Sequence, residues 1–172
     1  LLNFTNYAFS SEFVIESLKK GGKIVFIRHA IAPGSGDPEN IDLEDCTTQR
    51  NLNEEGIKQA KIIGNFFKDN KIEIDKILSS EWCRCKDTAK FAFGKFTTFS
   101  ALNSFYDEKF AKNEDKQIQE LDTFIKSWDN NKNLVLVTHY VVISAMLNKG
   151  VTSGEIVVLD KKLNLIGSIT TN

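Results

Sequence analysis

The sequence is poor in several features that would decide its class at once. Its 172 residues include only two histidines, two prolines, three cysteines and one methionine. No apolar run reaches the roughly 18 residues that a membrane span needs, so we expect none. The charged residues nearly cancel, to a formal net charge of -1. There is therefore no overall basic field of the kind that drives nucleic-acid binding, and any anion site must be built locally.

The length and composition predict one domain. A chain of 172 residues with 41% hydrophobic content suits a single globular domain with a sizeable core. We expect that domain to cover residues 1–172, with residues 1–22 as an N-terminal helical extension. The first residues lack the basic-then-apolar pattern of a signal peptide. A start at Leu1 fits a precursor whose export signal has been removed and fits a trimmed chain equally, so a periplasmic or exported location is only slightly favoured over a cytoplasmic one.

The cysteines leave two interpretations open. Cys83 and Cys85 are separated by one residue, which is the wrong spacing for a usual zinc knuckle or a thioredoxin motif. In one interpretation all three cysteines are reduced thiols, buried or half-buried. In the other, Cys46 is linked to Cys83 or Cys85, which implies an oxidising compartment.

Segments with strand and helix patterns alternate along the chain. Apolar, strand-length runs predict strands over residues 23–27, 74–80, 133–139, 155–160 and 163–170. Helical spacing of apolar residues predicts helices over 10–20, 53–70, 81–93, 113–130 and 140–147, the first of them capped by Ser10. The alternation predicts an α/β sandwich with a mostly parallel sheet. Residues 30–52 and 95–112 have no periodic pattern, and loops this long are usually functional.

Chemically potent side chains follow three of the predicted strands. Arg28 and His29 end the first strand, a polar turn containing Arg84 follows the second, and His139 ends the third. Ligands of open α/β sheets bind beyond the carboxyl ends of the strands, so we expect these groups to converge. A histidine alone would more often be a structural, hydrogen-bonded residue. Here both histidines of the chain lie at strand ends.

Two arginines and two imidazoles together favour phosphate chemistry. The guanidinium group pairs bidentately with phosphate oxygens, and two of them with a protonated imidazole balance the charge of a phosphoryl group. The other imidazole is able to attack phosphorus, provided that its far ring nitrogen donates to a backbone carbonyl.

Three motifs carry a specific resemblance. RHA at 28–30, SSEWCRCKDTA at 79–89 and LVLVTH at 134–139 resemble the motifs of the histidine phosphatase superfamily, also called phosphoglycerate mutase-like. The resemblance covers roughly residues 23–147. It implies a three-layer α/β sandwich in which helices flank a mostly parallel central sheet.

The resemblance also implies roles for individual residues. His29 stands at the position of the nucleophile that becomes a phosphohistidine, and Arg28, Arg84 and His139 stand at phosphate-binding positions. TQRNLNEEG, at 48–56, is similar to a further family segment and makes Arg50 a candidate fourth cation of the pocket. A salt bridge that stabilises the loop is the alternative role for Arg50.

The acid that protonates the leaving group is not assigned by the resemblance. Many relatives have a Glu after a leucine in the corresponding stretch, where this chain has Leu102, Asn103 and Ser104. Asp107, Glu108 and, in the long loop, Asp37 are the candidates. The alternative interpretation is that each of the three is a solvated carboxylate on the surface, without a catalytic role.

The sequence thus predicts a metal-independent phosphomonoesterase that uses no cofactor and acts through a phosphohistidine. Its partner is a small phosphorylated substrate, such as a sugar or lipopolysaccharide phosphate. The alternatives are a phosphohistidine protein phosphatase, a phosphoglycerate-type mutase and a catalytically impaired module that binds phosphate esters. A metal site at His29 and His139 is disfavoured because the neighbouring arginines would repel a divalent cation. The sequence does not indicate the oligomeric state.

Overall fold

A six-stranded mixed sheet forms the centre of the molecule. The structure is a computed structural model that describes residues 11–171, so Ser10, the predicted cap of the first helix, lies outside the described residues. The strands are β1 (Ile24–Arg28), β2 (Ile74–Ser79), β3 (Thr97–Thr98), β4 (Asn133–Thr138), β5 (Ile156–Leu159) and β6 (Leu165–Ile169). Their order across the sheet is β3-β2-β4-β1-β5-β6. The first four of these strands are parallel, whereas β5 and β6 run antiparallel to their neighbours.

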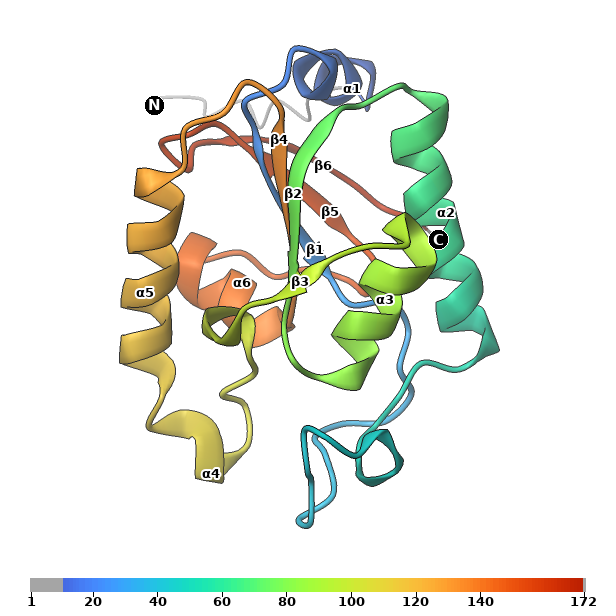
Figure 1. The fold of residues 1–172 in the computed structure, drawn as a ribbon, viewed down its shortest axis with the longest axis vertical. Helices are drawn as coiled ribbons and strands as arrows, with labels where there is room; N and C mark the ends of the chain where they lie inside the picture. Colours follow the sequence, from blue (N-terminus) through green and yellow to red (C-terminus); the bar gives the residue numbers. More distant parts are fainter. Residues whose placement is uncertain (1–10, 172) are drawn as a thin grey trace, which may run out of the picture.

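Helices cover both faces of the sheet (Figure 1). They are α1 (Ser11–Lys19), α2 (Glu54–Asp69), α3 (Cys83–Phe93), α4 (Glu108–Ala111), α5 (Glu114–Ser127) and α6 (Tyr140–Leu147). Helices α1, α2 and α3 pack on one face, and α5 and α6 pack on the other (Figure 1). The predicted three-layer α/β sandwich, with a mostly parallel sheet, is confirmed.

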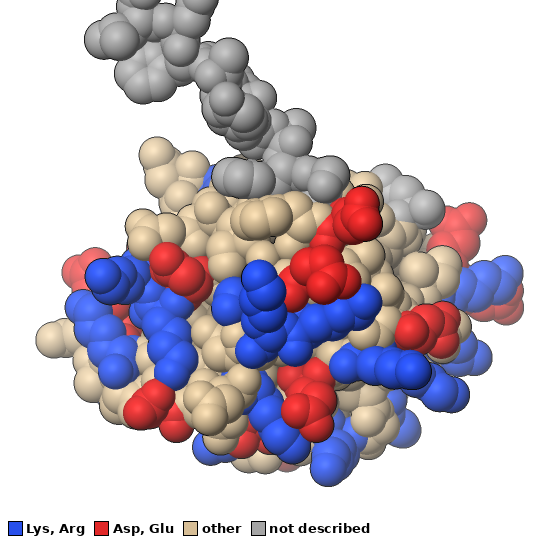
Figure 2. All heavy atoms as spheres, turned by 90° about the horizontal axis from the view of Figure 1, so that it is seen from above, with Lys and Arg blue, Asp and Glu red and all other residues tan. Residues whose placement is uncertain are grey.

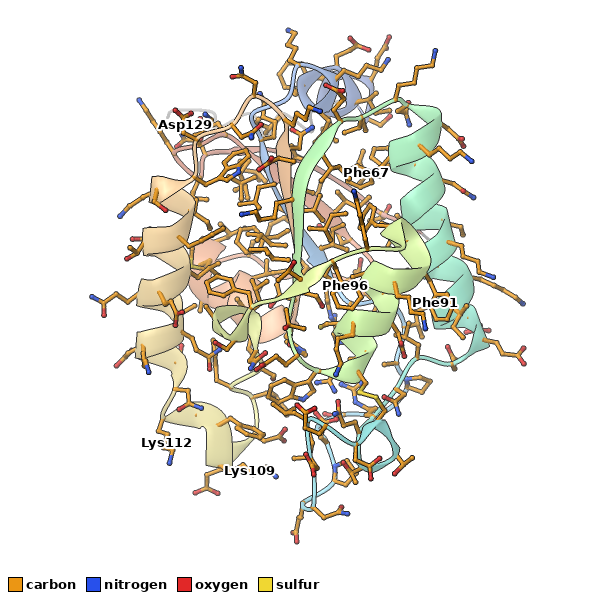
Figure 3. The ribbon with its side chains drawn as sticks, in the orientation of Figure 1. Phe67, Phe91, Phe96, Lys109, Lys112 and Asp129 are labelled. Atoms are coloured by element: carbon orange, nitrogen blue, oxygen red, sulfur yellow. A yellow bond between two sulfur atoms is a disulfide. The ribbon has the colours of Figure 1, made fainter. Side chains whose placement is uncertain are left out.

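The alternation of side chains along β1 divides the core into two layers. Val25 and Ile27 are fully buried against the residues of α1, α2 and α3. Ile24 and Phe26 are equally buried on the opposite face, beneath α5 and α6. In Figure 3, Phe67 points inward from α2, where its ring meets Phe93 edge-on at 5.3 Å. A strand buried on both faces explains why the apolar run of β1 has no polar residue before Arg28.

The two segments without a periodic pattern contain short elements. The first holds a 3₁₀ turn at Cys46–Thr48, and the second holds β3, a 3₁₀ turn at Ser100–Leu102 and α4. Elements of two to four residues do not repeat an apolar spacing, so no periodicity revealed them. Helix α5 also ends earlier than predicted, at Ser127, and Trp128 is its C-cap.

A disulfide between Cys46 and Cys83 joins the first of these segments to the start of α3. It closes a loop with a sequence separation of 37. Cys85 is a free, buried thiol. Of the two interpretations of the cysteines, the structure has the linked one, with Cys83 as the partner of Cys46.

Reduction of this disulfide should destabilise the protein. Cross-linking a loop of this length removes conformational entropy from the unfolded chain, so dithiothreitol should lower the free energy of unfolding by about 2–4 kcal/mol. Urea denaturation with and without reductant measures the difference. A double variant with Cys46→Ser and Cys83→Ser is the control, because its stability should not respond to the reductant. An equal response of both proteins would contradict the disulfide.

Candidate active site

The carboxyl ends of β1, β2 and β4 surround a cavity of about 190 Å³. All five of the predicted phosphate-site residues line it, namely Arg28, His29, Arg50, Arg84 and His139. The register of the sheet explains part of this convergence. Arg28 pairs with Thr138 across β1 and β4, so the residues that follow, His29 and His139, leave the sheet side by side. Their ring centroids are 5.5 Å apart.

His29 is held as a neutral imidazole with one free ring nitrogen. Its backbone N–H donates to the carbonyl of Thr138 at 2.9 Å. Its ring Nδ1 lies 2.8 Å from the carbonyl oxygen of Ala30, an atom that only accepts, so Nδ1 carries the proton and Nε2 keeps its lone pair. Burial, and next the charge of Arg84, lower the pKa of His29 well below 6.5. The side chain therefore satisfies the condition for attack on phosphorus.

His139 favours the neutral form as well, and the protonated imidazole expected beside a phosphoryl group stays a prediction. Burial is the largest cause that lowers its pKa well below 6.5, followed by the charge of Arg84. Nδ1 faces the Nη2 of Arg84 at 3.4 Å and accepts, since a guanidinium only donates. Nε2 then donates to the Oγ of Ser80 at 2.8 Å. The hydroxyl of Ser80 in turn donates to Asn103 at 3.1 Å.

A buried ion pair fixes Arg84. Its Nη1 donates to both carboxylate oxygens of Asp37, at 2.8 and 3.0 Å. The side chains of Arg84 and Asp37 are 3% and 1% exposed. Asp37 also accepts from the indole N–H of Trp82 and the backbone N–H of Arg50. Because its oxygens are occupied by these donors, Asp37 acts as a counterion and a loop anchor, and it is a poor candidate for the proton donor.

The two remaining arginines are held by backbone carbonyls. Arg50 donates from Nε to Gly36 at 2.9 Å and from Nη1 to Ala32. Arg50 thus both lines the pocket and braces the loop, although it forms no ion pair among residues 11–171. Arg28 donates from Nη1 to the carbonyl of Val151 at 2.8 Å. Burial lowers the pKa of both guanidinium groups.

The pocket has more donors than acceptors. It holds three guanidinium groups, and Asp37 neutralises one of them. Two buried N–H groups, Nε of Arg28 and Nε of Arg84, have no acceptor within the described part of the chain. Buried donors are costly when they lack a partner. The positive charge of the pocket therefore suits an oxyanion.

The structure separates the two neighbouring carboxylates that the sequence offered as acids. Asp107 lines the pocket, and its Oδ1 lies 3.3 Å from the position that a Cβ on Gly36 would take. Glu108 is exposed and is not part of the pocket lining. Asp107 is the N-cap of α4 and has an extended backbone, whereas Glu108 is the first helical residue, so the two side chains leave the chain in different directions. Ser104, at the position without a carboxylate, is a buried wall residue.

The third cysteine is not reactive. Its Sγ lies 3.4 Å from Nε2 of His139. Burial raises the pKa of the Cys85 thiol to about 12, so it remains protonated. Cys85 therefore packs beneath the site as a small apolar residue.

Two aromatic residues of the pocket lining, Tyr106 and Tyr140, were not predicted from the sequence. Tyr140 directly follows His139, and that adjacency was a usable signal. Tyr106 lies in the segment without a pattern and gave no signal. No group of three or more His, Cys, Asp or Glu residues suited to a metal ion occurs between residues 11 and 171.

The charge of the pocket contrasts with the opposite end of the sheet. Figure 2 shows the face at the amino ends of the strands, where basic and acidic side chains alternate without a field of one sign. No helix in the described part of the chain is long and apolar enough to cross a membrane.

Comparison with known structures shows the fold. The protein histidine phosphatase SixA, solved with tungstate, is 15% identical over 87% of this chain and 97% of its own, with a TM-score of 0.66. TTHB049 from Thermus thermophilus is 15% identical over 86% of this chain and 99% of its own, with a TM-score of 0.62. A mycobacterial glucosyl-3-phosphoglycerate phosphatase, solved with VO3, is 16% identical over 81% of this chain and 93% of its own, with a TM-score of 0.60.

The sequence itself matches one family. No curated protein sequence matches the chain significantly. The profile of the histidine phosphatase superfamily (branch 1) matches residues 24–103, which include His29, Arg50 and Arg84. This match over residues 24–103, together with the shared fold, makes the chain similar to the histidine phosphatase superfamily (branch 1).

Proposed function

We propose that the protein is a metal-independent phosphomonoesterase that forms a phosphohistidine on His29. The observation that carries this proposal is the ring of His29. It is neutral, its Nδ1–H is bound to a backbone carbonyl, and its free Nε2 belongs to a pocket lined by three arginines. A nucleophile beside a preorganised anion site is what phosphoryl transfer needs.

In the first step the phosphoryl group is transferred to the enzyme. Arg28, Arg50 and Arg84 hold the phosphate oxygens, and His139 donates once a rotation or proton uptake frees an N–H for the anion. Nε2 of His29 attacks phosphorus while the bond to the ester oxygen breaks. Asp107, in its protonated form, gives its proton to the departing oxygen, and the alcohol leaves.

In the second step water releases the phosphate. The carboxylate of Asp107 takes a proton from water, and the oxygen of that water attacks phosphorus. The P–N bond breaks, its electron pair returns to Nε2, and inorganic phosphate leaves. The fixed guanidinium groups stabilise the charge on the equatorial oxygens in both steps.

The substrate is a small phosphorylated molecule, of which a sugar or lipopolysaccharide phosphate is one case. A cavity of about 190 Å³ accommodates the phosphoryl group and the adjoining part of the leaving group. One protein with a similar fold is a glucosyl-3-phosphoglycerate phosphatase, which supports this class. SixA, another relative, is a protein histidine phosphatase. Ser104 stands at the position where many relatives have a carboxylate. The missing carboxylate favours protein histidine phosphatase activity as a second candidate function, because the departure of an imidazole depends less on a proton donor than the departure of an alcohol does.

We further propose that the protein works in an oxidising compartment, periplasmic or extracellular. The disulfide between Cys46 and Cys83 supports this location. Alkylation of intact cells before extraction tests it. Once the protein is denatured, only the free thiol of Cys85 is expected to carry the alkylating reagent. Alkylation of all three cysteines would contradict the proposed location.

Hydrolysis should depend on His29 and not on metal. Wild type should hydrolyse p-nitrophenyl phosphate equally with and without EDTA, whereas His29→Asn should lose at least about 10³-fold in kcat because no other group can take up the phosphoryl group. Release of nitrophenolate measures both. A large loss of activity with EDTA, restored by one metal ion, would contradict the proposal. Binding of the phosphate ester without turnover would indicate a binding module.

The two imidazoles should stay neutral as the pH falls through 6.5, because their pKa values in the folded protein lie well below that value. The unfolded chain then binds more protons than the folded one. The free energy of unfolding should consequently decrease as the pH drops below 6.5. Nitrogen NMR of the two ring systems, assigned with His139→Asn, follows the titration directly. A midpoint at or above 6.5 for His29 would contradict the account.

Asp107 and Glu108 offer a matched pair for the proton donor. Asp107→Asn should lower kcat about 10²–10⁴-fold for an alkyl phosphate, whose leaving group needs a proton. The loss should be much smaller for p-nitrophenyl phosphate, whose leaving group does not. Glu108→Gln removes a charge one residue away and should change neither rate appreciably. Equal losses with both substrates in Asp107→Asn would exclude a proton-donor role.

A further inference from the structure

Two exposed tyrosines line the pocket of the histidines. Tyr106 is 61% exposed and Tyr140 is 45% exposed. They are two of the six large hydrophobic residues that are exposed in the described part of the chain, and none of the other four lines this pocket. Isolated exposed aromatics are ordinary on a protein surface. Two at the opening of one catalytic cavity are a feature of that cavity.

Local contacts fix where each tyrosine lies. Tyr140 begins α6, immediately after His139, and the guanidinium carbon of Arg28 lies 5.5 Å from the centre of its ring. Tyr106 is held by its backbone N–H, which donates to the Oγ of Ser104 at 3.3 Å. Neither phenolic hydroxyl has a hydrogen-bond partner within residues 11–171. Arg28 therefore anchors one face of the Tyr140 ring, Ser104 anchors the backbone of Tyr106, and the polar ends of both rings are open.

The two tyrosines border the proposed path of the ester oxygen. Tyr140 is stacked on Arg28, which holds the phosphoryl group, and Tyr106 precedes Asp107, which protonates the leaving oxygen. The group attached to that oxygen must leave the pocket past these rings. An aromatic face binds best to another ring or to the C–H face of a sugar, and it binds a flexible chain less well.

We propose that Tyr106 and Tyr140 form a leaving-group subsite that selects phosphomonoesters of a ring-shaped alcohol, either a sugar or an aryl-bearing alcohol. This inference rests on the proposed phosphatase activity and adds the class of substrate to it. The open hydroxyls suit the sugar, because they supply donors and acceptors to ring hydroxyl groups. An aryl-bearing alcohol would make only the stacking contact with the two tyrosine rings.

The test compares ring and chain substrates that have similar chemistry at the ester oxygen. Benzyl phosphate is paired with butyl phosphate, and a hexose phosphate is paired with the open-chain hexitol phosphate. Each pair gives a ratio of kcat/KM, ring over chain, which cancels effects on phosphate binding and on chemistry. The variants are Tyr106→Leu and Tyr140→Leu, and Phe91→Leu is the control because Phe91 is exposed on α3 and is not part of the pocket lining (Figure 3).

A subsite predicts that each tyrosine variant lowers the ring-over-chain ratio by about three- to tenfold, mainly through KM of the ring substrate. Phe91→Leu should leave both ratios unchanged. A loss confined to the hexose pair in Tyr→Phe variants assigns the hydroxyls to a sugar, and no loss in those variants assigns the subsite to an aryl group.

Unchanged ratios in both tyrosine variants would overturn the inference, even if all rates fell together, because Tyr140 would then act only by supporting Arg28. Failure of the proposed function gives a different result. In that case wild type would release no phosphate from any of the four substrates.

Discussion

The pairing of β1 with β4 is the constraint on which the site depends. Their parallel register sets Arg28 opposite Thr138, and the N–H of His29 extends the ladder by one bond to the carbonyl of Thr138. Both strands are buried on both faces, so a slip of one residue would move every side chain to the opposite core layer and disrupt the packing of both layers. Two histidines far apart in the sequence are thereby fixed at 5.5 Å.

The electrostatics of the site follow from placing cations around buried imidazoles. Three guanidinium groups would be costly to hold together, and the carboxylate of Asp37 offsets part of that cost through its contacts with Arg84. The disulfide and the hydrogen bonds of Arg50 keep the loop that carries Asp37 in place. Burial, and next the charge of Arg84, favour the neutral form of His29, and the positive charge of the pocket suits an anion. The same charges thus serve phosphate binding and the readiness of the nucleophile.

Much of the fold and of the cation cluster was predictable from the sequence. Long apolar runs predict the strands of the sheet, and the polar residues that follow them predict the edge of the sheet where the site lies. Arg28, His29, Arg84 and His139 lie where the strand-end argument expects them. The choice between Asp107 and Glu108 was not predictable, since it depends on the direction of a four-residue helix. The partner of Cys46 and the place of Tyr106 depend on loop geometry, which follows from contacts between distant segments and leaves no periodic trace.

The central claim is a phosphoryl group carried by His29, and rapid-quench trapping tests it most directly. The chain has only two histidines, so mass spectrometry of peptides from enzyme quenched in base during turnover distinguishes them without ambiguity. We predict an acid-labile phosphate on the peptide that contains His29 and none on the peptide that contains His139, with the label appearing before free phosphate. Turnover with no trapped label, or a label on His139, would contradict the account.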